Sequence, residues 1–316
     1  MSDFEVRVAT DDDAPGIRRL FHRVFQKEMP EEEWDWKFAR NPDGWFGTVA
    51  VRGDEIVGNY AGWAMRVLLD GRARVAYSVG DVATDPTARA LGGRRGVYRS
   101  MTDLFYEVLG GRDVPFCFGF PNARAHEISN RLAGTRTLLP IREKHVPCDS
   151  FSAPPPGFAA GDFVGESFDP LWRAARRALA NAAMRDRARA NWRFHARPTR
   201  YYRMVWRDGG VDGMSSWAVL SVQGEQALVA DFLAADPAGS ELPELFAAAA
   251  AEARRLGAAK LVFWETPGGP GRPAIEALPG EIREAGFSFV VHSFDHAATD
   301  RFARDAHLTP ALYDVV

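Results

Sequence analysis

A turn rich in glycine and arginine, within D-V-A-T-D-P-T-A-R-A-L-G-G-R-R-G-V-Y-R-S-M, is the stretch of this sequence best suited to chemistry. Its basic and flexible residues are Arg89, Gly92, Gly93, Arg94, Arg95 and Gly96. Glycine lets the backbone curl tightly, so the free N–H groups and the positive end of a following helix face one point. These backbone donors and the fixed guanidinium charges predict a site for an anion of the phosphate type.

The elements on either side of the turn must position it. Residues 76–84 read as a strand that ends at Asp85-Pro86, and apolar side chains of residues 97–108 share one face of a predicted helix. The rest of the first half holds predicted strands at 4–9, 48–52, 56–67, 114–120 and 137–146, and predicted helices at 17–25 and 31–38.

The same order of elements returns in the second half of the chain. W-K-F-A-R-N-P at 36–42 is echoed by W-R-F-H-A-R-P at 192–198, an offset of 156 residues (192 − 36). D-V-A-T-D-P is echoed by D-F-L-A-A-D-P, V-P-F-C-F-G-F-P by K-L-V-F-W-E-T-P, and I-S-N-R-L-A-G by I-R-E-A-G-F. This order of landmarks predicts a tandem duplication of one α+β unit.

Only the first copy keeps the glycine- and arginine-rich turn. The second copy has D-P-A-G-S-E-L-P-E-L at that place, with no arginine and one glycine. A purely structural turn would have no reason to differ in this way, so the predicted anion site belongs to the first copy. The repeated Trp-Phe-Pro motif, which both copies keep, is expected to anchor a helix against the hairpin.

The length of 316 residues also favours two domains of about 150 residues each. The segment 149–165 contains P-P-P, several glycines and little periodicity, and is predicted to be a linker. The domains are therefore expected at 1–148 and 166–316. In the second domain, a long helix is predicted at about 170–189, strands at 203–222 and a helix at 242–256.

The composition excludes several classes of protein. A net charge of −3 and a pI near 6.2 argue against a surface built to hold nucleic acid. The start of the sequence lacks the features of a secretory signal, and no apolar run reaches the length of a membrane span. Cys117 and Cys148 form neither a disulfide scaffold nor a metal-ligand pattern. We expect a cytoplasmic protein, monomeric or homodimeric, without a metal or a membrane partner.

The strand, turn and helix around residue 92 resemble the acyl-coenzyme A site of the Gcn5-related N-acetyltransferases (GNAT), whose signature is Arg/Gln-x-x-Gly-x-Gly/Ala. W-D-W-K-F-A-R-N-P-D-G, D-P-x-x-R, G-R-R-G-V-Y and F-G-F-P-N resemble the subfamily with two such domains in one chain. The resemblance covers most of residues 4–148 and, in the second half, only the order of elements. It implies an α+β fold of two tandem acyl-coenzyme A N-acyltransferase-like domains, each a mixed, mostly antiparallel twisted sheet flanked by helices.

The resemblance also implies acetyl-coenzyme A, or another acyl-coenzyme A, as co-substrate. The strand at 80–84 would lie beside the pantetheine arm, and a backbone N–H there would polarise the thioester carbonyl. The turn at 93–97 would wrap the pyrophosphate. The expected contacts are Val82, Thr84, Arg89, Gly92, Gly93, Arg94, Arg95, Gly96, Val97 and Asn122.

The sequence departs from the family pattern at two places. Arg89-Ala90-Leu91-Gly92 fits the start of the signature, whereas G-R-R-G-V-Y fits its later half better, as if about four residues were extra. Counting from Asn122, the position where the family often has a tyrosine acid falls near Ser129. Serine is a far weaker acid, so the acid lies elsewhere or solvent serves, and a coenzyme A thiolate is a fair leaving group without one.

The attacking amine must lose a proton, which a side chain or a water chain can accept. Asp81 lies on the central strand, although alternation can aim it away from the ligand. His126 lies one turn beyond Asn122, where a lone histidine is more often a surface or packing residue. Glu127 and the terminal carboxylate of Val316 are further candidates. Asp81, His126 and Ser129 form the candidate catalytic set.

The aromatic residues Trp34, Tyr60 and Tyr98 are candidates for the walls of an acceptor pocket, whereas core packing is the alternative for aromatic residues in this region. The leading hypothesis is acetyl transfer to the primary amine of a small molecule such as an amino sugar, an antibiotic or an amino acid derivative. A non-catalytic acyl-coenzyme A sensor is an alternative. A transferase that takes aminoacyl groups from tRNA is another, but it would need a basic groove.

Overall fold

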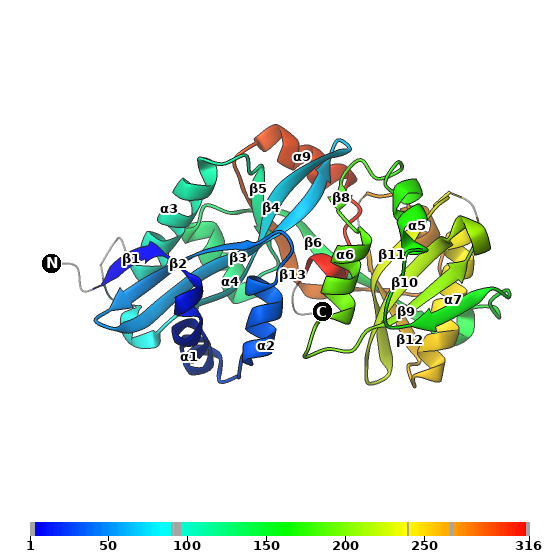
Figure 1. Ribbon diagram of the computed structural model, residues 1–316, viewed down its shortest axis with the longest axis horizontal. Helices are drawn as coiled ribbons and strands as arrows, with labels where there is room; N and C mark the ends of the chain where they lie inside the picture. Colours follow the sequence, from blue (N-terminus) through cyan, green and yellow to red (C-terminus); the bar gives the residue numbers. More distant parts are fainter. Residues whose placement is uncertain (1–3, 90, 92–95, 239, 266–267, 314–316) are drawn as a thin grey trace. The chain divides into compact units, whose positions relative to one another are not determined.

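The computed structural model describes residues 4–89, 91, 96–238, 240–265 and 268–313 (Figure 1). The chain divides into two compact units. The N-terminal unit comprises Met1–Arg66, Arg74–Leu139 and Ser288–Thr299. The C-terminal unit comprises Val67–Ala73, Pro140–Phe287 and Asp300–Val316. Each unit therefore contains a segment from the other half of the chain.

The N-terminal unit is built on a mostly antiparallel sheet. Its strands are β1 (Glu5–Val8), β2 (Trp45–Arg52), β3 (Glu55–Leu69), β4 (Arg72–Thr84), β5 (Phe116–Gly119) and the end of β13 (Glu281–Ser293). Strands β1, β2 and β3 pair antiparallel. Asp70 and Gly71, with φ of 50° and 75°, make the tight turn between β3 and β4. Strand β4 pairs with β5 in parallel, and β5 pairs with β13 antiparallel.

Helices cover both faces of this sheet (Figure 1). They are α1 (Ala14–Phe25), α2 (Glu31–Trp34), α3 (Val97–Gly110) and α4 (Ala123–Leu132). Helix α3 buries Met101 and Phe105 in a cluster with Tyr60 of β3. Leu20 of α1 and Trp34 of α2 belong to a separate cluster that contains Val49 of β2. The amphipathic stripe predicted at 17–25 is confirmed.

The repeated Trp-Phe motif forms the same local structure in both copies. Asp35–Ala39 and Asn191–His195 are each a single π-helical turn, closed by the bonds from Arg40 N to Asp35 O (2.7 Å) and from Ala196 N to Asn191 O (2.8 Å). Each turn directly extends a four-residue helix, α2 in the first copy and α6 (Arg187–Ala190) in the second. The similarity of the two motifs is therefore structural as well as sequential.

The C-terminal unit repeats the sheet of the N-terminal unit. Its strands are β6 (Arg136–Pro147), β7 (Phe158–Gly161), β8 (Ala182–Ala183), β9 (Arg203–Asp208), β10 (Met214–Gln223), β11 (Gln226–Ala234) and β12 (Lys260–Glu265). Pairing is antiparallel from β7 through β9 and β10 to β11, parallel from β11 to β12, and antiparallel from β12 to β6. This is the same series of pairings as from β1 to β13.

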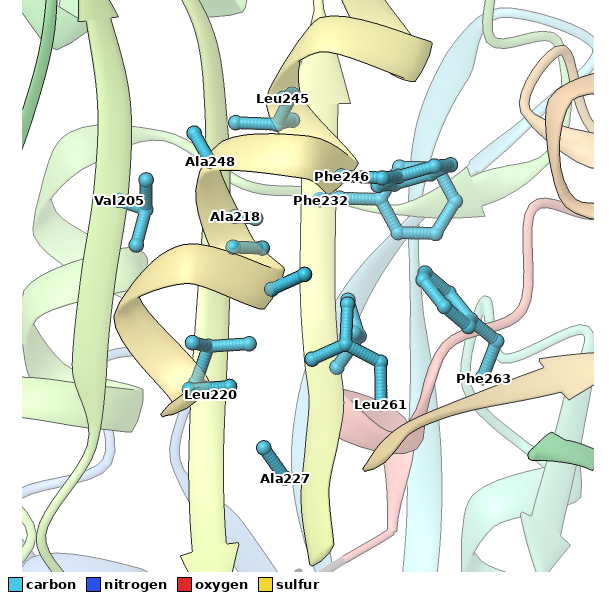
Figure 2. Close-up of a cluster of buried hydrophobic side chains, with 14 of the residues drawn as sticks. Val205, Ala218, Leu220, Ala227, Phe232, Leu245, Phe246, Ala248, Leu261 and Phe263 are labelled. Carbon is cyan, nitrogen blue, oxygen red and sulfur yellow. The ribbon is translucent and has the colours of Figure 1, made fainter. Parts of the chain in front are cut away.

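The helices of the second half include α5 (Phe168–Ala175), α7 (Glu241–Arg255), α8 (Arg272–Glu276) and α9 (His296–Asp305). Figure 2 shows how α7 packs on the sheet of the C-terminal unit: Leu245 and Phe246 of α7 meet Leu220 of β10 and Phe263 of β12 in one buried cluster. The helix predicted at 242–256 is confirmed.

The single helix predicted at 170–189 is wrong. Helix α5 ends at Ala175, and Ala182 and Ala183 form β8, which pairs with Leu68 and Val67 of β3. The Ala-rich composition favours a helix locally, but backbone pairing with the β3–β4 hairpin prevails. The segment 149–165, predicted to be a linker, contains β7, which pairs with β9.

Candidate functional site

The candidate site lies in the N-terminal unit where β4 and β5 separate. The parallel pairing joins only Tyr77 to Cys117 and Ser78 to Phe118. Strand β5 ends at Gly119, whereas β4 continues to Thr84. The side chains of Val79 to Val82 are half-buried, after the fully buried stretch of Ala76 to Ser78. The edge of β4 that faces β5 is thus left without its strand partner after Ser78.

A bulge at Asp81 marks this separation. Asp81 has φ of 52°, a left-handed conformation that costs a non-glycine residue about 1–3 kcal/mol. Val79 and Val82 both pack against the same hydrophobic cluster, although residues three apart in a regular strand point to opposite faces. The bulge therefore turns Asp81 away from the face that regular alternation would give it.

The Asp81 side chain forms an ion pair with a buried lysine. Lys37 Nζ lies 2.5 Å from Asp81 Oδ2, and the two side chains are 7% and 14% exposed. Lys37 is part of the π-helical turn at Asp35–Ala39, and its ammonium lies 5.3 Å from the centroid of the Trp63 ring. The carboxylate that the sequence offers as a general base is thus already bound to a cation.

Backbone and hydroxyl groups at the end of β4 complete this region. The carbonyl of Asp81 accepts a hydrogen bond from Asn59 Nδ2 at 3.0 Å. The hydroxyl of Thr84 is buried and has no hydrogen-bond partner among the described residues. A buried polar group without a partner is rare and needs an explanation. Bonding to a ligand in the open edge would satisfy it.

Next along the chain is the glycine- and arginine-rich turn at residues 89–96, which the sequence predicts to bind an anion and which is here called the anion turn. Asp85 accepts hydrogen bonds from the N–H and hydroxyl of Thr87 and from Arg23 Nε, and the Thr87 hydroxyl is the main reason that the pKa of Asp85 lies below its usual value. Arg89 donates to the carbonyl of Thr84 at 3.4 Å. The predicted contacts Gly92, Gly93, Arg94 and Arg95 lie outside the described residues.

Helix α3 begins where the anion turn ends. Gly96 is its N-cap and offers no capping side chain, and the first turn carries no acidic residue. Among the described residues, no side chain caps the N–H groups of this turn, and the positive end of a 14-residue helix can attract an anion. Gly58 of β3 lets α3 start close to the sheet, because a Cβ there would lie 2.9 Å from Val97 Cγ1.

Asn122 and the candidate residues His126 and Ser129 lie on α4. The Asn122 side chain is the N-cap of the helix and accepts a hydrogen bond from Ala125 N at 3.0 Å. His126 Nε2 lies 2.6 Å from Thr137 Oγ1, and Ser129 donates to the carbonyl of His126 at 3.0 Å. These contacts of His126 and Ser129 are local to α4 and the strand that follows it.

The three candidate aromatic walls do not form one surface. Trp34 is 2% exposed and packs against Phe38 and Trp45. Tyr60, also 2% exposed, lies in the other cluster of the unit, and its hydroxyl is 2.6 Å from that of Tyr106. Burial raises the pKa of both of these tyrosines well above the usual value.

Tyr98 is the more accessible of the two tyrosines proposed as walls. It is half-buried on the first turn of α3, edge-on to Tyr60 with ring centroids 5.8 Å apart. Burial raises the pKa of Tyr98 to about 12, so its phenol is protonated at neutral pH. Its place one residue after Val97 puts it next to the anion turn.

Sequence reasoning missed Lys37 and Asn59. The signal for Lys37 was present in the sequence, because a lysine between Trp36 and Phe38 in a repeated apolar motif is poorly placed for solvent. Its partner Asp81 lies 44 residues away, and local patterns carry no information on that pairing. Asn59 gave no signal, since one asparagine in a strand pattern is not distinctive.

The corresponding place in the C-terminal unit is closed. Val219 pairs with Asp231 and Leu220 with Val229, so β11 has an irregularity at Ala230, beside the counterpart of Asp81. Arg185 Nε lies 2.9 and 2.8 Å from the two carboxylate oxygens of Asp231. The Thr309 hydroxyl also donates to Asp231, at 2.9 Å.

A buried histidine from the C-terminal segment seals the same region. His307 Nε2 lies 3.3 Å from the carbonyl of Phe232, and the two rings meet edge-on. Complete burial, with a contribution from the Arg185 charge, lowers the pKa of His307 to about 3.

Among the described residues, no three histidine, cysteine or acidic side chains are placed to hold a metal ion. In that part of the chain, no helix is long and apolar enough to cross a membrane.

One family model and several solved structures are similar to this chain. Residues 5–131 match the family model described as an acetyltransferase (GNAT) domain. A GCN5-related N-acetyltransferase from Anabaena variabilis has a TM-score of 0.70 at 13% identity, over 93% of this chain and 74% of that one. No curated protein sequence matches the chain.

Two further structures are similar over nearly the whole chain. A tandem GNAT protein from the clavulanic acid biosynthesis pathway has a TM-score of 0.57 at 13% identity, with 92% of this chain and 98% of that chain covered. The N-myristoyltransferase of Saccharomyces cerevisiae with bound myristoyl-CoA has a TM-score of 0.56 at 8% identity, with 92% and 83% covered. At these identities the likeness concerns the fold, and it confirms the expected α+β acyltransferase architecture.

Proposed function

We propose that this chain, whose residues 5–131 match the model of an acetyltransferase (GNAT) domain, transfers an acetyl group from acetyl-coenzyme A to the primary amine of a small molecule. The observation that carries the proposal is the separation of β4 from β5 at the Asp81 bulge, directly before the anion turn and the start of α3. The extended pantetheine arm of the donor needs an unpaired strand edge, and its pyrophosphate needs an anion site directly after that edge.

The donor would bind along the open edge of β4. Backbone groups at Val82 and Thr84 would bond the pantetheine arm, and the buried Thr84 hydroxyl gains the partner that it lacks among the described residues. The pyrophosphate would occupy the turn formed by Arg89 and residues 92–97, at the start of α3. Asn122, exposed at the start of α4, can offer its side-chain N–H groups to the same arm while its oxygen caps the helix.

The reaction would proceed by direct attack in a ternary complex. The neutral amine nitrogen forms a bond to the thioester carbon, and the carbonyl electrons move to oxygen, where an N–H such as that of Val82 stabilises the charge. The intermediate then reforms the carbonyl as the C–S bond breaks, and the coenzyme A thiolate leaves with the electron pair. The nitrogen loses one proton and the sulfur gains one, so the products are the amide and coenzyme A.

Proton transfer would rely on water and on the residues nearest the bulge. Asp81 lies at that point, and its carboxylate already accepts a hydrogen bond from the buried ammonium of Lys37. His126 could act as the base, and Ser129 as the acid, only after breaking their hydrogen bonds to the Thr137 hydroxyl and to the carbonyl of His126. We therefore expect water to accept the amine proton and to protonate the thiolate.

The C-terminal unit would not bind a second donor. Its counterpart turn lacks arginine, and the buried Arg185, His307 and Thr309 fill the region around Asp231. We propose that this unit, a degenerate copy, supports the catalytic unit, and that one chain binds one acyl-coenzyme A.

A thiol-release assay tests the activity. Acetyl-coenzyme A and acyl-coenzyme A thioesters with longer acyl chains are each tested with amino sugars, aminoglycosides, amino acid derivatives and polyamines. Release of coenzyme A that depends on one amine class, and that is lost in Gly96→Glu and Arg95→Glu, is expected because each change puts a carboxylate at the pyrophosphate site. Release that is equal in the wild type and in both variants would refute the site.

A non-catalytic acyl-coenzyme A sensor is the second candidate. It is favoured by one observation: Ser129, near the position where the family often has a tyrosine acid, is engaged in a local hydrogen bond to the carbonyl of His126. A sensor predicts tight donor binding with no thiol release for any amine in the panel.

A further inference from the structure

The strained residue at the bulge is fixed at both of its polar ends. Asn59, fully buried on β3, donates to the carbonyl of Asp81. Lys37 binds its carboxylate at 2.5 Å. A left-handed residue in mid-strand persists only when its surroundings over-determine it, and these two contacts come from different elements. Asp81 is therefore held in place by the protein rather than by its own conformational preference.

Lys37 is well placed to hold Asp81 in this conformation. It is 5% exposed, and its ammonium lies 5.3 Å from the Trp63 ring and 5.5 Å from the Phe38 ring. The π-helical turn at Asp35–Ala39 carries it, and Trp36 of the same turn packs edge-on against Trp63 of β3. A long flexible side chain is thus restricted to one position by aromatic packing, which makes its ion pair more rigid than a surface pair.

The C-terminal unit provides an independent instance of the same arrangement. Asp231 stands at the equivalent point of its strand, beside an irregularity, and a buried arginine neutralises it. That arginine is Arg185, whereas the sequence counterpart of Lys37 is Arg193, which bonds the Tyr202 hydroxyl and two backbone carbonyls instead. The two copies thus pair the corresponding carboxylates with cations from different positions, so the neutralised carboxylate at this point is common to both copies.

The two units differ in what lies next to the pair. In the C-terminal unit the pair is 4% and 2% exposed and sealed by Thr309. In the N-terminal unit Asp81 is more exposed, and the residue after it is Val82, whose N–H we assign to the thioester carbonyl. A shift of Asp81 would be passed through one peptide unit to that N–H.

We propose that Lys37 is a positioning residue: by holding Asp81 in the bulge, it aims the Val82 N–H at the acyl carbonyl of the donor. This inference rests on the proposed function, because it requires acyl-coenzyme A to lie along β4. It assigns the Lys37–Asp81 pair to carbonyl alignment rather than to proton abstraction. It also gives the motif W-K-F-A-R-N-P a role in the donor site that its echo W-R-F-H-A-R-P does not have.

The test compares donors with and without the acyl carbonyl. Calorimetry gives the affinities of the full chain for acetyl-coenzyme A and coenzyme A, and infrared difference spectroscopy with carbonyl-labelled acetyl-coenzyme A reports the hydrogen bond to the carbonyl. Lys37→Met is expected to weaken acetyl-coenzyme A binding by about fivefold to tenfold, to leave coenzyme A within about twofold, and to move the carbonyl band toward its value in water. Lys37→Arg is expected to restore most of the band shift.

Two further variants separate positioning from stability. Lys37→Met combined with Asp81→Asn removes the pair without leaving an unpaired buried charge, and it is expected to fold and still to lose the carbonyl shift. Arg7→Met breaks the bidentate pair with Asp13 in the same unit and is expected to lower the melting temperature without moving the band. A carbonyl band unchanged in the double variant would overturn the inference. Absence of binding of both ligands to the wild type would instead refute the proposed function.

Discussion

At the scale of single residues, the two copies of the motif use their cations for different tasks. Lys37 turns inward to Asp81 beside the open edge of β4. Arg193, at the corresponding place, bonds the carbonyls of Ala311 and Tyr313 and so ties the end of the chain to the C-terminal unit. The two copies share one local structure, and they differ in the partners of the side chain at this position.

Loss of one partner of the buried pair of Arg185 and Asp231 should strongly destabilise the C-terminal unit. Arg185→Met leaves the carboxylate 2% exposed and without its cation, and is expected to cost about 3–5 kcal/mol in the free energy of unfolding. The exposed pair of Arg187 and Asp169 is the control, because Arg187→Met should cost less than about 1 kcal/mol. Urea titration measures both, and equal costs would contradict the role given to burial.

His307 should make stability depend on pH. Its pKa in the folded protein is about 3, below the ordinary value of 6.5, so between these pH values the unfolded chain binds a proton that the folded chain does not bind. Above pH 6.5 the histidine is neutral in both states and does not reduce the free energy of unfolding. As the pH falls from 6.5 toward 3, the free energy of unfolding decreases by at most about 1.4 kcal/mol per pH unit. Comparison of the wild type with His307→Gln by urea titration between pH 7 and 5 measures this loss. A difference between the two proteins that does not change with pH would count against it.

At the scale of elements, the sequence predicted what is local. The strand at 76–84 and the helix at 97–108 follow from periodicity, and the duplicated order of elements exposed the repeat. The last strand of each sheet comes from the other half of the chain, and this was not predictable. Val290–Ser293 of β13 pairs with Phe116–Gly119 of β5, whereas β6 pairs with β12, and no local pattern encodes that choice. The short strand β8 was missed for the same reason, because its partner is the distant β3.

The cap of α4 offers a test that separates fold from binding. Asn122→Ala removes the oxygen that accepts from Ala125 N and should cost about 1 kcal/mol of stability. Asn122→Asp keeps a good cap but has no side-chain N–H to offer the pantetheine arm. We expect the aspartate variant to keep wild-type stability and to bind coenzyme A several-fold more weakly. Wild-type affinity in Asn122→Asp would remove Asn122 from the donor site.

At the scale of the whole molecule, one series of strand pairings is present twice, and the two copies differ at the place of the proposed donor site. Both units have the same series of strand pairings and both have an acid beside an irregular strand residue. Only the N-terminal copy combines the open edge with a turn of arginine and glycine at the start of a helix. The sequence could predict this asymmetry from composition, but not the sealing of the second copy by Thr309 and His307, since those residues belong to the last part of the chain.

The number of donor molecules bound per chain tests this account most directly. Calorimetric titration of the full chain with acetyl-coenzyme A is predicted to give one site, which Gly96→Glu at the start of α3 abolishes. Ser240→Glu, at the matching N-cap of α7, is the control and should leave the titration unchanged. Two sites per chain, or a titration that Ser240→Glu abolishes and Gly96→Glu does not, would contradict the assignment of the donor site to the N-terminal unit.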